Sequence, residues 1–240
     1  MAQFLSPVLA LLGGVLPALV WLSFWLREDK EHPEPRRLII AVFLAGALAV
    51  IPTYLIQELM RALWQLSVDD KLLPTITAWA ASEELIKYLV VAGIAFSTSA
   101  FDEPIDAMIY LITAALGFAA AENSLFMFNV LLSDNSNHVN FWLNGNFRFI
   151  GATIVHVVSS SILGGFIALA FCETRARRLL ALIAGLCTAT ILHAAFNYFI
   201  IKSASSDILK IFILFWALAI VIIYLFERVK KVVCYFRPNL

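Results

Sequence analysis

Long apolar runs, separated by short clusters of charged residues, make up most of this chain. Each run is roughly 20 residues long, and at about 1.5 Å per residue a helix of that length crosses a hydrocarbon core of roughly 30 Å. The pattern predicts about seven such helices, at residues 4–26, 38–57, 75–97, 105–129, 148–172, 179–201 and 207–227. We therefore predict an all-α fold, a polytopic bundle of transmembrane helices, in which residues 1–240 form one integral membrane domain.

Two features of the apolar pattern predict departures from straight, continuous spans. Residues 58–74 place leucines at helical spacing among polar side chains, which is typical of a helix lying in the membrane interface or of a water-exposed connection. Pro17 and Pro52 lie inside predicted spans, where a proline removes a backbone hydrogen bond and kinks the helix. We expect an interfacial helix or a wet connection at 58–74, and kinks at both prolines.

The composition is that of a membrane protein. Hydrophobic residues make up 62% of the chain and charged residues 14%, whereas soluble domains are roughly half apolar and a quarter charged. Lys and Arg number 17, as do Asp and Glu, so a formal net charge of zero gives no support for nucleic-acid binding or for an acidic disordered tail. The lipid bilayer is the expected environment, and the lack of an organelle-targeting signal fits a bacterial or archaeal plasma membrane.

The basic residues are distributed unequally between the two ends of the predicted spans. Eleven of them share one side: Arg27, Lys30, Arg36, Arg37, Arg175, Arg177, Arg178, Arg228, Lys230, Lys231 and Arg237. Four lie on the other side: Arg61, Lys71, Lys202 and Lys210. Because Lys and Arg are retained on the cytoplasmic side of a membrane, we predict an amino terminus outside the cell and a carboxyl terminus in the cytoplasm.

A small set of ionisable, amide and hydroxyl side chains lies inside four of the predicted spans. These residues are Glu83, Glu84 and Lys87, then Glu122 and Asn123, then His156 and Ser160, and finally His193 and Asn197. A charged side chain near the centre of a membrane helix costs roughly 2.5–3.5 kcal/mol on insertion scales. Side chains that cost this much usually face the interior of the bundle and mark a functional site.

Spacing predicts that these side chains meet. Counted from the span ends, five of them lie at one level, on the order of 12 Å below the outer boundary at 1.5 Å per residue. These five are Glu83, Glu84, Glu122, His156 and His193. Three pairs are four residues apart and share a helix face: Glu83 with Lys87, His156 with Ser160, and His193 with Asn197. We expect a single polar site inside the bundle.

Two kinds of hydrolytic chemistry fit these residue types. A buried glutamate can act as a general base on water and then as an acid toward the leaving group, with one histidine holding the water and a second histidine and an amide stabilising an oxyanion. Two histidines and a glutamate can instead form an open zinc site of the His₂Glu kind, with a remaining glutamate as the base. The sequence has no HExxH, Gly-rich phosphate loop or GxSxG motif, and both mechanisms stay open.

The same residues also have structural interpretations, and they fit other functions. Lys87 with a neighbouring glutamate is an ion pair within one helix, and His193 with Asn197 can join helices by hydrogen bonds. Asn123 and Ser160 are expected to support the structure. The alternatives to an enzyme are a transporter or proton-coupled carrier that uses buried Glu and His as a relay, and a non-catalytic membrane binding or immunity protein.

Four ordered motifs resemble those of the PrsW family of intramembrane proteases, which is similar to the wider group of type II CAAX prenyl endopeptidases and bacteriocin-immunity proteins. The motifs are EExxK at 83–87, FxxxEN at 118–123, the following His156, and HxxxN at 193–197. They define a catalytic-motif core at about residues 75–201. The resemblance implies an intramembrane endopeptidase that cleaves a single-pass membrane protein. An example of such a reaction is the first cut in an anti-sigma factor during stress signalling.

The resemblance also implies roles for individual residues. Glu83 resembles the water-activating glutamate, beside an essential second glutamate, and His193 and Asn197 resemble the oxyanion-side pair of the prenyl endopeptidases. The chain departs from those enzymes at Glu122, where they place a histidine, and we expect His156 to supply the missing imidazole. This departure favours the PrsW branch. The resemblance leaves both the zinc and the glutamate-only mechanism open.

Overall fold

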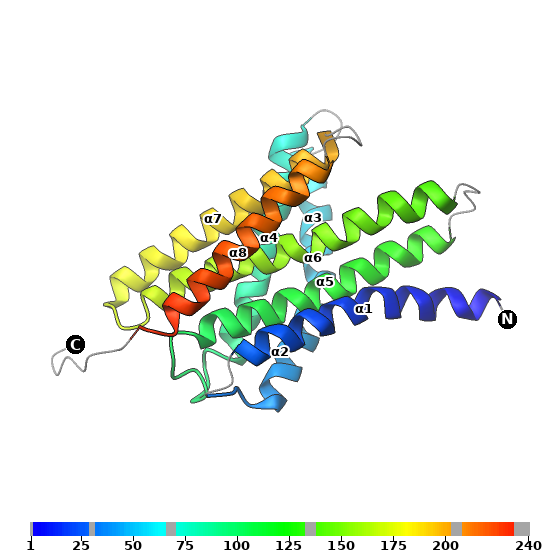
Figure 1. The fold of residues 1–240 in the computed structure, drawn as a ribbon. Helices are drawn as coiled ribbons and strands as arrows, with labels where there is room; N and C mark the ends of the chain where they lie inside the picture. The colour runs from blue at the N-terminus through cyan, green and yellow to red at the C-terminus, as the bar shows by residue number, and fades with distance from the viewer. Residues whose placement is uncertain (1, 29–31, 66–70, 133–137, 203–207, 233–240) are drawn as a thin grey trace.

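Helices form all the regular structure of the described part of the chain. The computed structural model describes residues 2–28, 32–65, 71–132, 138–202 and 208–232. Its helices are α1 (Ala2–Glu28), α2 (Arg36–Leu48), α3 (Val50–Trp64), α4 (Leu72–Ile94), α5 (Asp106–Leu132), α6 (His138–Leu169), α7 (Arg175–Lys202) and α8 (Ile208–Val229). No strand occurs in these residues, so the predicted all-α fold is confirmed. In Figure 1, α1, α5 and α6 run side by side, and α4 crosses α5 and α6 at a steep angle.

Six segments of the described chain are long and apolar enough to cross a membrane. They are Pro7–Arg27, Arg36–Trp64, Asp106–Asn129, Gly151–Leu169, Arg175–Lys202 and Leu209–Val229. α4 has a comparable length of 23 residues but carries Glu83, Glu84 and Lys87, which make it less apolar. The prediction of a polytopic transmembrane bundle is confirmed, and the protein is an integral membrane protein.

The two prolines inside the predicted spans have different effects. α1 continues through Pro17 as one helix. The second span instead breaks at Ala49 into α2 and α3. Pro52 has no N–H to donate to the carbonyl of Leu48, four residues earlier, so the break falls where the helix loses this hydrogen bond. The kink expected at Pro52 is therefore a break between two helices.

The connection after α3 differs from the prediction. Residues 58–64 of the stretch predicted as an interfacial helix or a wet connection form the end of α3 instead of a separate element. Nothing interrupts the backbone hydrogen bonds of α3 until Gln65 adopts a left-handed φ of 50°. Residues 66–70 lie outside the described residues, and α4 begins at Leu72. The leucines that suggested an interfacial helix instead extend a candidate span.

α5 forms the centre of the bundle. It packs against α1, α2 and α6, and every residue from Ile105 to Ala120 is buried. A helix that is buried on all sides needs apolar residues on all sides, as α5 has over most of this range. Gly46 of α2 and Gly117 of α5 let these two helices approach closely, because a Cβ at either position would overlap the backbone of the facing helix. This contact fixes the position of α5, which carries Glu122 near its exposed part.

Consecutive spans run in opposite directions when α2 and α3 are counted as one span. The amino terminus lies at the end of the bundle where α5 is followed by α6, whereas the α6–α7 connection and the end of α8 lie at the opposite end (Figure 1). The basic residues in the last turn of α1, the first turn of α7 and the last turn of α8 are therefore at the same end. This is the grouping on which the predicted orientation depends.

Candidate active site

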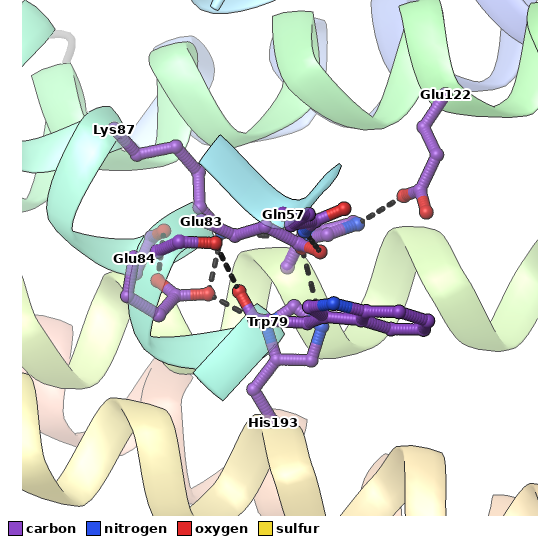
Figure 2. Close-up of polar contacts among 10 residues, drawn as sticks. Gln57, Trp79, Glu83, Glu84, Lys87, Glu122 and His193 are labelled. Atoms are coloured by element: carbon purple, nitrogen blue, oxygen red, sulfur yellow. Dashed lines mark hydrogen bonds and ion pairs between the residues drawn. The ribbon is translucent and has the colours of Figure 1, made fainter. Parts of the chain in front are cut away.

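α4 contributes a fully buried ion pair to the interior of the bundle. Glu84 and Lys87 are both 0% exposed, and Lys87 Nζ lies 2.5 Å from Glu84 Oε1. The same carboxylate accepts hydrogen bonds from His193 of α7, through Nδ1 at 2.8 Å, and from the hydroxyl of Ser160 of α6 at 3.3 Å. A buried ion pair is stable only when additional hydrogen bonds satisfy its remaining atoms, and Glu84 meets this condition. Glu84 thus joins α4, α6 and α7 (Figure 2).

A second set of contacts runs from Lys87 to α5. Lys87 Nζ lies 3.2 Å from Nδ1 of His156, and Nε2 of His156 lies 2.7 Å from Oε2 of Glu122. Because an ammonium group only donates, Nδ1 accepts, and Nε2 carries the proton that is donated to Glu122. His156 is 1% exposed, whereas the side chain of Glu122 is 46% exposed. These hydrogen bonds connect the buried Glu84 to a carboxylate at the edge of the bundle.

One carboxylate oxygen of Glu83 accepts a hydrogen bond, and the other has no donor among the described residues. Gln57 of α3 donates to Oε1 at 3.1 Å. Oε2 is buried, accepts no hydrogen bond from the described residues, and lies 3.5 Å from Nε2 of His193 (Figure 2). When His193 is neutral and donates its Nδ1 proton to Glu84, Nε2 of the imidazole is also an acceptor. Two facing acceptors favour a proton donor or a cation between them, and water or a metal ion meets this requirement.

Most of the residues that the sequence singles out come together in one cluster. The members of this cluster are Glu83, Glu84, Lys87, Glu122, His156, Ser160 and His193. They come from α4, α5, α6 and α7, the four helices that carry the motifs. The rings of His156 and His193 lie edge to face with centroids 4.9 Å apart, so both imidazoles border the same small volume.

Asn123 and Asn197 make no hydrogen bond to this cluster. Asn123 donates to Oγ1 of Thr153 at 3.0 Å, a contact that ties α5 to α6. Asn197 is half-buried, one turn beyond His193 on α7, and hydrogen-bonds to none of the residues that the structure describes. The amide of Asn197 therefore keeps its hydrogen-bonding capacity for a ligand.

Gln57 is a site contact that the sequence interpretation misses. It lies on α3, outside the four helices that carry the motifs, yet it holds one oxygen of Glu83. A signal was present in the sequence, because Gln57 is an amide at the end of a mostly apolar stretch. Gln57 is the last residue of the predicted span 38–57, so its amide was compatible with a place at the membrane boundary. Because α3 continues beyond residue 57, Gln57 lies within the helix and not at its end.

The donor set of the site fits a divalent metal ion. Glu83, His156 and His193 each offer one ligand atom, and these atoms lie within 4.8 Å of one another. Two imidazoles and one carboxylate are the His₂Glu ligands of catalytic zinc sites. With neutral imidazoles, three carboxylates and one ammonium leave the cluster a formal charge of −2, which a divalent cation would neutralise. Ligation by His156 would replace its hydrogen bond to Lys87 or to Glu122, since both ring nitrogens are engaged.

The chain is similar to one family of membrane proteins. A family model described as "PrsW family intramembrane metalloprotease" matches residues 34–225. The "Protease PrsW" of Oceanobacillus iheyensis is 28% identical over 211 residues, which are 87% of this chain and 91% of that protein. The "Protease PrsW" of Shouchella clausii is 24% identical over 219 residues, covering 87% of this chain and 93% of that protein.

A more similar but shorter match involves the "Protease PrsW" of Geobacillus kaustophilus. The two chains are 32% identical over 115 residues, which are 48% of this chain and 50% of that protein. This match therefore spans about half the length of that relative. No solved structure matches the chain.

Proposed function

The chain belongs to the PrsW family of intramembrane metalloproteases, and from that premise we propose that it is an endopeptidase that hydrolyses a peptide bond in, or just outside, the membrane span of a single-pass membrane protein. The observation that carries this proposal is the pair of facing acceptors in the site, Glu83 Oε2 and His193 Nε2, which lie 3.5 Å apart. A water molecule that donates to both atoms is held where a carboxylate can remove its proton.

We assign the chemical steps to residues around this water. Glu83 accepts a proton from the water while the water oxygen forms a bond to the carbonyl carbon of the scissile peptide. The same carboxyl group then delivers the proton to the leaving amine as the C–N bond breaks. His193 holds the water through Nε2, and its 2.8 Å hydrogen bond to Glu84 fixes the orientation of the ring. Asn197, one turn along α7, supplies a donor for the oxyanion.

The family description implies a metal. A divalent metal held by Glu83, His156 and His193 would polarise the scissile carbonyl and make bound water a stronger nucleophile at neutral pH. Glu84 would then fix the tautomer and ring orientation of His193, as carboxylates commonly do for metal-binding histidines. Zinc suits this donor set. Both forms draw on the same cluster, but in the zinc form Glu83 and His193 would be metal ligands, and a remaining glutamate would act as the base.

The exposure of Glu122 supports an entry point for water and substrate. Its side chain is 46% exposed, while the side chains of Glu83 and His193 are 11% and 3% exposed, so we place the entry beside Glu122. We infer an anti-sigma-factor-like substrate and regulated proteolysis from the four motifs that resemble the PrsW family. The distribution of basic residues supports an orientation with the amino terminus outside.

Replacing Glu83 tests the proteolytic function. Membrane-protein fragments from cells that carry the wild type should include products that disappear with Glu83→Gln, because the amide does not accept a proton from water. We expect cleavage to fall roughly 10²- to 10⁴-fold, the usual contribution of a general base. The fragments are compared by mass spectrometry of isolated membranes.

A matched control keeps this test specific. Glu173→Gln removes a carboxylate from an exposed ion pair with Arg177, 2.8 Å long, and should leave the fragments unchanged. Identical fragment profiles for the wild type and a folded Glu83→Gln variant would refute the proposed function.

A further inference from the structure

Trp79 is an aromatic residue of α4 that the proposed mechanism does not use. It lies four residues before Glu83, so the two side chains share one face of α4. The residue is half-buried, and in Figure 2 its indole extends past the His193 ring toward the side of the site where Glu122 lies. Arg61 of α3 lies over the ring, with Cζ 5.4 Å from the centroid, a cation–π contact that favours one ring orientation.

The indole N–H of Trp79 is buried and has no hydrogen-bond acceptor among the described residues. A buried donor without a partner costs free energy, and native proteins retain few of them. Such a group beside a catalytic cluster is explained when a ligand supplies the acceptor.

The other donors around Glu83 are already engaged. The engaged donors are the Gln57 amide, which donates to Glu83; Lys87, which donates to Glu84 and His156; the Ser160 hydroxyl and His193 Nδ1, which donate to Glu84; and His156 Nε2, which donates to Glu122. Two donors near the cluster, the Trp79 indole and the Asn197 amide, have no acceptor within the part of the chain that the structure describes. A peptide bond that enters the site brings an acceptor, its carbonyl oxygen.

We propose that the indole N–H of Trp79 donates a hydrogen bond to the carbonyl oxygen of the scissile peptide, an assignment that rests on the endopeptidase function proposed above. The carbonyl oxygen gains negative charge when water adds to the carbonyl carbon, so this hydrogen bond is stronger in the transition state than with bound substrate. Loss of the N–H therefore lowers kcat more than it raises KM. Trp79 and Asn197 together would provide the two donors of an oxyanion hole.

Trp79→Phe tests the assignment, because it removes the N–H and keeps an aromatic ring. The matched control is Trp25→Phe: Nε1 of Trp25 is also buried without an acceptor among the described residues, but Trp25 lies on α1 against Phe226 of α8, with ring centroids 5.3 Å apart. The full-length proteins are placed in phosphatidylethanolamine–phosphatidylglycerol vesicles. The probe is a quenched fluorogenic peptide with one apolar span of about 20 residues and a polar extension.

Trp79→Phe should lower kcat roughly 10²- to 10³-fold and change KM by less than about twofold, whereas Trp25→Phe should match the wild type. Should Trp79→Phe fail to fold, Trp79→3-benzothienylalanine keeps the bicyclic shape and replaces the N–H by sulfur. A kcat within about twofold of the wild type in either folded variant overturns the assignment, as does an equal loss in Trp25→Phe.

Glu83→Gln in the same assay separates this assignment from the proposed function. Cleavage that is lost in Glu83→Gln but retained in Trp79→Phe overturns only the role of Trp79. Cleavage that persists in Glu83→Gln overturns the endopeptidase function and this assignment together.

Discussion

Lys87 determines how the charges of the site are balanced. An uncompensated charge near the centre of a membrane helix costs roughly 2.5–3.5 kcal/mol, and Lys87 offsets this cost for Glu84 at a distance of 2.5 Å. The intrahelical ion pair that the sequence offered as a structural interpretation is therefore present. It also places Glu84 where that carboxylate accepts the Nδ1 proton of His193, so structural support and the proposed chemistry depend on the same contact.

The zinc form of the mechanism predicts a metal content that depends on His156. Purified wild-type protein should contain about one zinc ion per chain, and His156→Ala should lose it because one of three protein ligands is removed. His32→Ala is the matched control, since His32 is 71% exposed and pairs with Glu103. Elemental analysis by mass spectrometry measures the difference. Zinc-free wild-type protein that still cleaves its substrate would contradict the zinc form and favour the glutamate-only form.

Among the helices, α3 combines little burial with important polar contacts. Thr53 is the one buried residue within α3, whose fifteen residues are all described. Nevertheless, Gln57 of α3 donates to Glu83, and Arg61 lies over Trp79. α3 packs mainly against α4, the helix that carries both Glu83 and Trp79. The contacts of Gln57 and Arg61 therefore depend on the packing of α3 on α4.

Two glycine substitutions should have opposite effects on the free energy of unfolding, because Gly117 lies at the close contact of α2 and α5 and Gly93 does not. Gly117→Ala should lower the free energy of unfolding by about 1–3 kcal/mol, because the new Cβ would overlap the backbone of Phe43. Gly93→Ala on α4 meets nothing within 4 Å and should raise the free energy of unfolding by up to about 1 kcal/mol through helix propensity. Unfolding in detergent micelles measures both. Equal effects of the two substitutions would contradict the tight packing of α2 on α5.

For the whole molecule, the basic residues predict one orientation in the membrane. A fluorescent protein fused after the carboxyl terminus should fluoresce, because that terminus is expected in the cytoplasm. Alkaline phosphatase placed before the amino terminus should be active, because it requires the oxidising side of the membrane. Activity in the reverse pattern would show that the eleven basic residues on one side do not face the cytoplasm.

Span positions were predictable because a bilayer imposes a length and a composition on any helix that crosses it. The predicted span 105–129 and the observed Asp106–Asn129 differ by one residue. The break before Pro52 also follows from a local rule, the missing N–H of proline. The extent of α3 did not follow, because leucines at helical spacing after residue 57 suit an interfacial helix as well as a spanning one.

The sequence by itself determined the fold class and most of the ionisable residues that meet at the site, because both depend on local composition and spacing. It left open whether Glu83 or Glu84 pairs with Lys87, and it did not place Gln57 or Trp79 beside Glu83. Only the tertiary structure decided these points, because they depend on how each helix is rotated against its neighbours. Such rotation is set by contacts between distant positions, such as His193 and Glu84, which are 109 residues apart in the chain and 2.8 Å apart in the fold.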